Sequence, residues 1–262
     1  MAGSRGTALV TGTSAGIGAV YARRLAGLGY DLVLVARREE RLRALAAELT
    51  AAHGVRAEVL RADLTADADI HRVAARAGGE DLTLLINNAG VGGYGPFAQV
   101  EPDALEGLAH LHILAPMLAT RAALPGMLAR GRGAVINVAS LLAFSGAMPP
   151  GPLPHRATYA GAKAFLVHFT RTLAGELRGT PVRAQVVCPG MTFTEFNGGY
   201  PGTMSPEDVV TASLVALERG ETVCVPGLAS AEAVTALEQA EAGMLRGGQY
   251  TLAERYRSPG TT

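Results

Sequence analysis

The chain has 262 residues, of which 48% are apolar, and its 23 Lys and Arg residues balance its 23 Asp and Glu residues. A chain of this length can bury a sizeable core, and its zero net charge gives no long-range attraction to nucleic acid or to an anionic membrane. No apolar run reaches the roughly 18 uninterrupted residues of a membrane span, and strand-like sequence from residue 7 onward predicts no signal peptide.

Taken in chain order, short apolar runs alternate with segments of helical spacing. The runs predict strands at 7–12, 31–36, 55–64, 82–90, 133–140, 182–190 and 222–227, and the spacing predicts helices at 15–29, 38–53, 66–78, about 101–130, 156–178 and 205–219. This alternation favours an α/β fold: a single doubly wound Rossmann domain over 1–262, with a parallel seven-stranded sheet, helices on both faces and a helical C-terminal extension at 229–262.

Two cysteines, Cys188 and Cys224, each lie in a strand-like apolar run. Two isolated cysteines of this kind indicate small buried residues, and they do not suggest a disulfide framework or a metal site. We therefore expect no metal and a reducing, cytoplasmic location.

A glycine-rich stretch follows the first predicted strand, Thr11-Gly12-Thr13-Ser14-Ala15-Gly16-Ile17-Gly18. Glycines at this spacing allow a tight turn and a close approach of the backbone to a pyrophosphate, which the N-terminus of the next helix also attracts. A glycine pattern alone is a weak signal and fits an ordinary turn, but its position between a strand and an apolar helix predicts a dinucleotide site.

The end of the second predicted strand bears on the choice of cofactor. NAD sites usually carry an acid there for the ribose 2′-hydroxyl, whereas this strand ends in Arg37 and Arg38, and Asp31 lies at its other end. A guanidinium offers two parallel donors to a 2′-phosphate, so Arg37 favours NADP(H). The plainer interpretation is that both arginines are solvated residues of a first helical turn.

Tyr159 and Lys163 are four residues apart in a predicted helix, so they share one face. A nearby ammonium stabilises a phenolate, which would make such a tyrosine a proton donor or acceptor closer to neutral pH. Ser140 ends the fifth predicted strand at the sheet edge where open α/β proteins bind ligands. Each of these residues on its own fits a structural role. The ordered set of three is a more specific signal of a catalytic site.

These motifs resemble one family, the short-chain dehydrogenases/reductases, over about residues 5–227. The resemblance rests on TGTSAGIG (11–18), NNAG (87–90), Ser140, YAGAK (159–163) and PGMTFT (189–194). It implies hydride transfer between a nicotinamide cofactor and a carbonyl carbon, and the Arg37 arrangement resembles NADP(H)-preferring members.

The resemblance also assigns roles residue by residue. The cofactor-binding residues that it implies are Gly12, Thr13, Ser14, Gly16, Ile17, Gly18, Arg37, Arg38, Asp63, Leu64, Asn88, Ala89, Gly90, Tyr159, Lys163, Pro189, Gly190, Thr192 and Thr194. Tyr159 would donate the proton, Lys163 would lower its pKa and bind the nicotinamide ribose, and Ser140 would orient the carbonyl. Members commonly pair through helices that match 101–130 and 156–178 here, so we expect a homodimer or homotetramer.

The chain departs from the family's pattern at His112, in the stretch LHILAP (111–116). The family usually has an asparagine at this position, which helps to hold a water molecule of a proton relay to the lysine. A histidine can keep this role, since either ring nitrogen donates or accepts, or it can disrupt the relay. The alternative is a tolerated polar residue that catalysis does not need.

A second departure is the proline-rich insertion 148–156, between Ser140 and Tyr159, which we expect at the mouth of the pocket. His155 within it is either a solvated loop residue or a substrate contact. The segment 195–204 corresponds to a substrate lid, and its glycines favour mobility. Aromatic residues of these loops would line an apolar pocket or pack in an ordinary way; they are Phe144, Phe193, Phe196 and Tyr200.

We therefore predict an NADP(H)-dependent carbonyl reductase that acts on a small or medium apolar molecule, with no nucleic-acid or membrane partner. A cyclase or isomerase on the same fold is the alternative that His112 and the insertion suggest, and a non-catalytic NADP-binding regulator is the alternative from another class. Intact Ser140, Tyr159 and Lys163 argue against the regulator. Usage rich in Ala, Gly and Arg is associated with high-GC bacteria, in which such reductases often serve secondary metabolism.

Overall fold

The computed structural model describes residues 5–151, 153–198, 203–248 and 252–257. The chain forms two compact units, Met1–Pro226 and Gly227–Thr262. The second unit holds α8 (Glu232–Gly247), which is the helix predicted for the C-terminal extension, and a short 3-10 helix at Glu254–Tyr256. That residues 1–262 form one domain stays a prediction.

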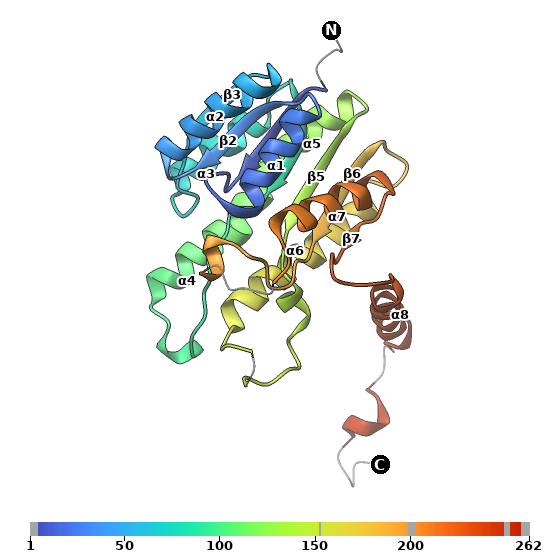
Figure 1. The fold of residues 1–262 in the computed structure, drawn as a ribbon. Coiled ribbons are helices and arrows are strands. Elements are labelled where there is room, and N and C mark those ends of the chain that lie inside the picture. Colours follow the sequence, from blue (N-terminus) through green and yellow to red (C-terminus); the bar gives the residue numbers. More distant parts are fainter. Residues whose placement is uncertain (1–4, 152, 199–202, 249–251, 258–262) are drawn as a thin grey trace. The chain divides into compact units, whose positions relative to one another are not determined.

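The first unit is built on a seven-stranded parallel sheet (Figure 1). Its strands are β1 (Thr7–Thr11), β2 (Asp31–Ala36), β3 (Ala57–Arg61), β4 (Leu82–Asn87), β5 (Gly133–Val138), β6 (Val182–Val187) and β7 (Val223–Cys224), in the order β3-β2-β1-β4-β5-β6-β7. The sheet confirms the predicted fold class. The chain runs outward from β1 on one side and from β4 on the other, so the point where the order reverses lies between β1 and β4.

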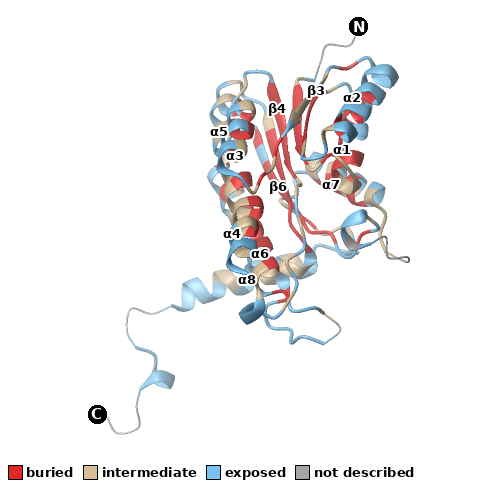
Figure 2. Ribbon diagram, turned by 90° about the vertical axis from the view of Figure 1, so that its left-hand side faces the viewer, coloured by how far each residue is buried: buried red, intermediate tan, exposed pale blue. Residues whose placement is uncertain are grey.

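Helices cover both faces of the sheet, as predicted (Figure 2). They are α1 (Gly16–Gly27), α2 (Glu39–His53) and α7 (Pro206–Glu218) on one face, and α3 (Asp67–Ala77), α4 (Pro102–Ala109), α5 (Ala115–Ala129) and α6 (Ala157–Glu176) on the other. Ser205 begins α7 as predicted, because its hydroxyl accepts a hydrogen bond from the Asp208 amide.

The edge strands are shorter than the sequence predicts. β3 covers 57–61 instead of 55–64, and β7 has two residues instead of six. Both strands pair on one side only, β3 with β2 and β7 with β6. Apolar residues beyond the last ladder partner therefore continue as loops, although their sequence suits a strand.

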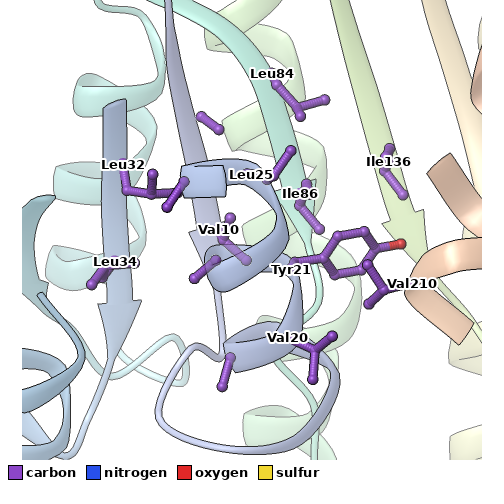
Figure 3. Close-up of a cluster of buried hydrophobic side chains, with 14 of the residues drawn as sticks. Val10, Val20, Tyr21, Leu25, Leu32, Leu34, Leu84, Ile86, Ile136 and Val210 are labelled. Carbon is purple, nitrogen blue, oxygen red and sulfur yellow. The ribbon is translucent and has the colours of Figure 1, made fainter. Parts of the chain in front are cut away.

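The two faces of the sheet hold separate apolar clusters. Figure 3 shows the first, in which strand residues Val10, Leu32, Leu34, Leu84, Ile86 and Ile136 meet Val20, Tyr21 and Leu25 from α1 and Val210 from α7. Burying one such aliphatic side chain stabilises a fold by roughly 1.5–3 kcal/mol. The packed core fixes the strands, and with them the positions of the loops at their carboxyl ends.

The predicted helix 101–130 consists of three parts: α4, a π-helical segment at His110–Leu114, and α5. Within the described residues, one helix, Pro102–Ala129, is long and apolar enough to cross a membrane. Here its residues Ala119, Ala123 and Met127 are buried in the second cluster, where α5 packs against α3 and β4. It is a core helix of the α/β unit.

A buried polar chain ties α6 to the sheet. The Asn87 amide donates to Asn137 Oδ1 at 2.8 Å, and the Asn137 amide donates to Thr170 Oγ1 at 2.8 Å. Asn87 and Asn137 are register partners of β4 and β5, and Thr170 lies on α6. Because buried polar groups must be paired, this chain fixes how α6 sits on the sheet.

Candidate active site

The glycine loop lies at the carboxyl end of β1 and leads into α1. Gly12 and Gly16 have φ values of +77° and +56°, which side-chain-bearing residues rarely adopt. A Cβ atom at Gly18 would clash with the carbonyl oxygen of Gly12, so this glycine lets α1 begin directly against the turn. Ala15 provides no side-chain cap, and the first amides of α1 remain available to an anion.

The NNAG loop is joined to the end of β1 through Thr11. The Thr11 hydroxyl accepts from the amides of Asn88 and Ala89 at 2.9 and 3.0 Å, and the Asn88 side chain donates to the Thr11 carbonyl at 2.8 Å. Gly12 is also close to this loop, since a Cβ there would lie 2.7 Å from Nδ2 of Asn88. These bonds, between Thr11 and Asn88 at a separation of 77 residues, join the two predicted cofactor loops.

Ser140, Tyr159 and Lys163 come together at the carboxyl edge of β5. Ser140 follows the strand and caps a short 3-10 helix by accepting from Leu142 N. Tyr159 and Lys163 project from α6 and are both buried, and Lys163 Nζ lies 5.7 Å from the centre of the Tyr159 ring. Nζ donates to the carbonyl oxygen of Val138, the last residue of β5, at 2.9 Å.

Burial dominates the ionisation of this group. It raises the pKa of Tyr159, as does the charge of Tyr94, while a hydrogen bond with Ser140 lowers it. It also lowers the pKa of Lys163 to about 7. That Lys163 lowers the Tyr159 pKa, as the resemblance implies, stays a prediction.

His112 lies in the π-helical segment, with 1% of its surface exposed. Its Nε2 is 3.0 Å from the carbonyl oxygen and 3.2 Å from the amide nitrogen of Val91, in the loop after NNAG. Its Nδ1 is buried without a hydrogen-bond partner among the described residues. Burial, and then the charge of Lys163, lower the pKa of His112 well below its ordinary value, so the ring is neutral at pH 7.

Gly90 brings His112 and Lys163 close to one point. A Cβ at Gly90 would lie 3.0 Å from Cε1 of His112 and 3.7 Å from Nζ of Lys163. His112 itself lies in a π-helical turn, a feature that occurs often at functional sites.

The arginines after β2 differ in their contacts. Arg37 is exposed and forms no hydrogen bond or ion pair with any described residue. Arg38 donates from Nε and Nη2 to the Ser14 hydroxyl at 3.1 and 2.8 Å, and from Nη1 to Glu195 at 2.9 Å. Arg41, one turn later on α2, also binds Glu195. A cluster of cations therefore borders the glycine loop.

The other predicted cofactor residues lie along the same edge with less specific contacts. The Asp63 carboxylate accepts from the amide and hydroxyl of Thr65, and Leu64 is buried. The Pro189 carbonyl accepts from Leu141 N, and Thr192 is buried. A Cβ at Gly16 would lie 3.1 Å from the Thr194 methyl, so the loop after β6 reaches the glycine loop. Thr13 and Ile17 lie within that loop, and Gly190 follows Pro189.

The insertion is held by a buried arginine. Arg156, 7% exposed, donates to Ser145 Oγ at 2.7 Å and to the carbonyl oxygens of Ser145 and Met148, both at 2.8 Å. It is the residue that precedes α6, so these bonds also fix the approach to Tyr159. His155 contributes its carbonyl to Gly95 N, and its role as a substrate contact stays a prediction.

Two further aromatic rings lie close to Tyr159. The rings of Tyr94 and Phe196 lie 5.2 and 6.2 Å from it, centre to centre. Large apolar side chains of the adjoining loops are exposed, namely Leu141, Phe144, Met148, Met191 and Phe193. Phe144 and Phe193 are exposed and Phe196 lies beside Tyr159, so an apolar lining formed by them stays a prediction, and Tyr200 lies outside the described residues.

Four residues of this region were not predicted: Thr11, Arg41, Tyr94 and Glu195. The spacing of Arg41, three after Arg38, placed it on the same face of α2 and could have indicated it. Tyr94 lies in a loop and Glu195 in a short 3-10 helix, and no local pattern connects them with Tyr159 or with the arginines.

Comparison with known proteins gives a consistent result. Residues 6–203 match the family described as short chain dehydrogenase. Curated relatives include very-long-chain 3-oxoacyl-CoA reductases of Podospora anserina, 38% identical over 198 residues, and of Phaeosphaeria nodorum, 35% identical over 227 residues. The alignments cover 73% and 83% of this chain but 56% and 65% of those proteins, so the chain spans somewhat over half the length of these relatives.

Two solved structures match over nearly their full length. A short-chain dehydrogenase from Sphingobium yanoikuyae in complex with NADPH has a TM-score of 0.89 and 37% identity, over 96% of this chain and 100% of that one. A bulky-bulky ketone specific alcohol dehydrogenase from Comamonas testosteroni has a TM-score of 0.89 and 33% identity, over 97% and 99%.

Proposed function

Because this chain belongs to the short-chain dehydrogenase family, we propose that it is an NADPH-dependent reductase of bulky, apolar ketones with Tyr159 as the proton donor. The family makes it an oxidoreductase. The substrate class and the roles of individual residues are the parts that we propose.

The cofactor is NADP(H), and the residues present fit it. The left-handed Gly12 and Gly16 and the uncapped start of α1 suit a pyrophosphate. Arg37 and Arg38 follow β2, where an NAD-binding chain would carry an acid for the 2′-hydroxyl. The neighbour from Sphingobium yanoikuyae, which matches over 96% of this chain, was solved with NADPH.

Ser140, Tyr159 and Lys163 would each have a separate role in the reaction. When bound, the cofactor supplies the hydride. Ser140 would donate a hydrogen bond to the substrate carbonyl, and Tyr159, whose phenol is protonated at pH 7, would deliver a proton to the same oxygen. Lys163, anchored to Val138, would stabilise the phenolate that remains.

The aromatic rings beside Tyr159 carry the substrate proposal. Tyr94 and Phe196 approach it from two separate segments, and Met191 and Phe193, a few residues before Phe196, are exposed. A carbonyl placed at Tyr159 would lie close to these two rings. Two relatives support this class by their names, one as a reductase of very-long-chain 3-oxoacyl-CoA and one as an enzyme for bulky-bulky ketones.

A ketone panel tests the proposal. NADPH consumption would be followed with diaryl ketones, long-chain 3-oxoacyl thioesters, short-chain 3-oxoacyl thioesters and small polar ketones. We expect kcat/KM to be at least about tenfold higher for the bulky apolar members than for the small ones, since each buried methylene contributes to discrimination. Preference for small polar ketones would refute the substrate class. Product formation without NADPH consumption would favour the cyclase or isomerase.

The cellular location and the metabolic role are questions separate from the reaction. Two free, buried cysteines support a reducing, cytoplasmic location, which we propose with the homo-oligomer discussed below. A role in bacterial secondary metabolism has no support, because the curated relatives named above are fungal 3-oxoacyl-CoA reductases.

A further inference from the structure

Glu195 joins three segments that are far apart in sequence. One carboxylate oxygen accepts from Arg38 Nη1 at 2.9 Å and the other from Arg41 Nη1 at 2.7 Å. Arg38 also holds the Ser14 hydroxyl, and Arg41 donates to the Ser14 carbonyl oxygen at 3.4 Å. The carboxylate therefore occupies an anion position formed by two arginines beside the glycine loop.

The same segment reaches Tyr159 on its other side. Glu195 and Phe196 are consecutive residues of a short 3-10 helix, and the Phe196 ring lies 6.2 Å from the Tyr159 ring. Thr194, just before them, packs against Gly16. One short stretch thus contacts both the nucleotide loop and the proposed proton donor.

We infer that Glu195 is a cofactor-specificity residue, whose carboxylate competes with the 2′-phosphate of NADP(H) for Arg38 and Arg41. The inference rests on the NADP(H) site proposed above. A 2′-phosphate would replace the carboxylate on these arginines and release Glu195, and with it Phe196, from its present position. NAD(H), which has only a hydroxyl there, would leave Glu195 in place.

The balance of interactions allows this exchange. Glu195 and both arginines are about half exposed, and exposed ion pairs of this kind are weak. A phosphate monoester carries a charge of about −1.5 to −2 at neutral pH and three acceptor oxygens, against a single negative charge on a carboxylate. Arginine binds phosphate through two parallel bonds, so the 2′-phosphate is the stronger ligand.

Glu195→Gln tests the competition directly. It removes the charge and keeps the shape, so the Kd for NADPH should fall by about 3- to 10-fold while the Kd for NADH changes by less than about twofold. Glu48→Gln is the matched control, because Glu48 is also an exposed glutamate paired with an arginine, Arg23, on α1 and α2 away from the site. It should change neither value.

A weaker NADPH affinity in Glu195→Gln would overturn the inference, since it would mean that Glu195 orients the arginines for the phosphate. Equal changes for NADPH and NADH would overturn it as well, because Glu195 would then repel the pyrophosphate shared by both. If wild type shows no preference for NADPH, the proposed cofactor site itself fails, and that result is visible before any variant is compared.

Release of Glu195 and Phe196 can be followed by the fluorescence of an introduced tryptophan, because the chain itself contains no tryptophan. In Phe196→Trp, 2′,5′-ADP should change the fluorescence, whereas 5′-ADP at matched occupancy should not. In Phe196→Trp combined with Glu195→Gln, the starting spectrum should already resemble the 2′,5′-ADP state. An equal response to both nucleotides would show that the 2′-phosphate does not act through Glu195.

Discussion

The ring of His112 meets the ring of Tyr159 edge-on, with 5.7 Å between their centres and 79° between their planes. A charged imidazole in this position would be buried beside the ammonium of Lys163, and the His112 pKa is accordingly lowered well below its ordinary value. A histidine with its ordinary pKa would cause an acid decline in rate near pH 6.5, and the lowered pKa of His112 means that we do not expect this decline. The residue acts as a neutral partner of the Val91 backbone.

His112→Asn should keep or raise activity, because an amide retains a donor and an acceptor for the π-helical turn, whereas His112→Ala should lower turnover by about tenfold. Between about pH 6 and 8, the rates of wild type and of His112→Asn should depend on pH in the same way. Steady-state rates with one ketone check both points. Equal activity in wild type, Asn and Ala variants would remove His112 from the mechanism.

Tyr159→Phe keeps the ring and removes the proton. Turnover should drop by about 100-fold or more, while NADPH affinity changes little, because the hydroxyl acts on the substrate oxygen. Tyr94→Phe is the matched control, since its ring lies 5.2 Å away, and it should lose less than about tenfold. A larger loss in Tyr94→Phe than in Tyr159→Phe would reverse the two roles.

Lys163 makes stability depend on pH. Burial lowers its pKa in the folded protein from 10.5 to about 7, so between these values the unfolded chain binds more protons than the native one. The free energy of unfolding should therefore rise with pH across this window, by up to about 1.4 kcal/mol per pH unit from this group. Below about pH 7 both states hold the proton and the contribution is constant.

Urea unfolding of wild type and Lys163→Met at about pH 7 and pH 9 isolates the effect. The stability of wild type relative to the variant should increase with pH. If the difference in unfolding free energy between wild type and Lys163→Met does not change with pH, Lys163 keeps its ordinary pKa in the folded protein.

Arg37→Asp should weaken NADPH binding by about tenfold or more and relatively favour NADH, because Arg37 is free of partners in the described structure and available to a 2′-phosphate. Arg43→Asp, an equal charge change on α2 at a residue already paired with Glu39, is the control. Fluorescence titration with both cofactors measures the ratio. Equal affinity of wild type for NADPH and NADH would refute this role.

Assembly is predicted through α5 and α6. Leu128 on α5 is 42% exposed, and Val215 on α7, on the opposite face of the sheet, is 40% exposed. Leu128→Glu should weaken a dimer or tetramer, and Val215→Glu should not, since a charge is costly only where it is buried in an interface. Light scattering at micromolar concentration gives the mass. A monomeric wild type would contradict the prediction.

Local patterns were sufficient for most of the helices and strands and for their order along the chain. Strands with helical crossovers can form a parallel sheet in few ways, so the sequence indicated the sheet and the edge at which Gly12 and Ser140 lie. The four-residue spacing of Tyr159 and Lys163 predicted one helix face, because that relation is set by helix geometry alone.

The sequence alone therefore determined the sheet edge at which the glycine loop and Ser140 lie, through periodicity, glycine spacing and the turn residues. Only the tertiary structure decided their electrostatics and their partners. Burial lowers the pKa values of Lys163 and His112. A local sequence pattern does not show how far distant elements bury a residue. The contact of Glu195 with Arg38 spans 157 positions and depends on how two loops pack, so the sequence predicts both loops but not the ion pair between them.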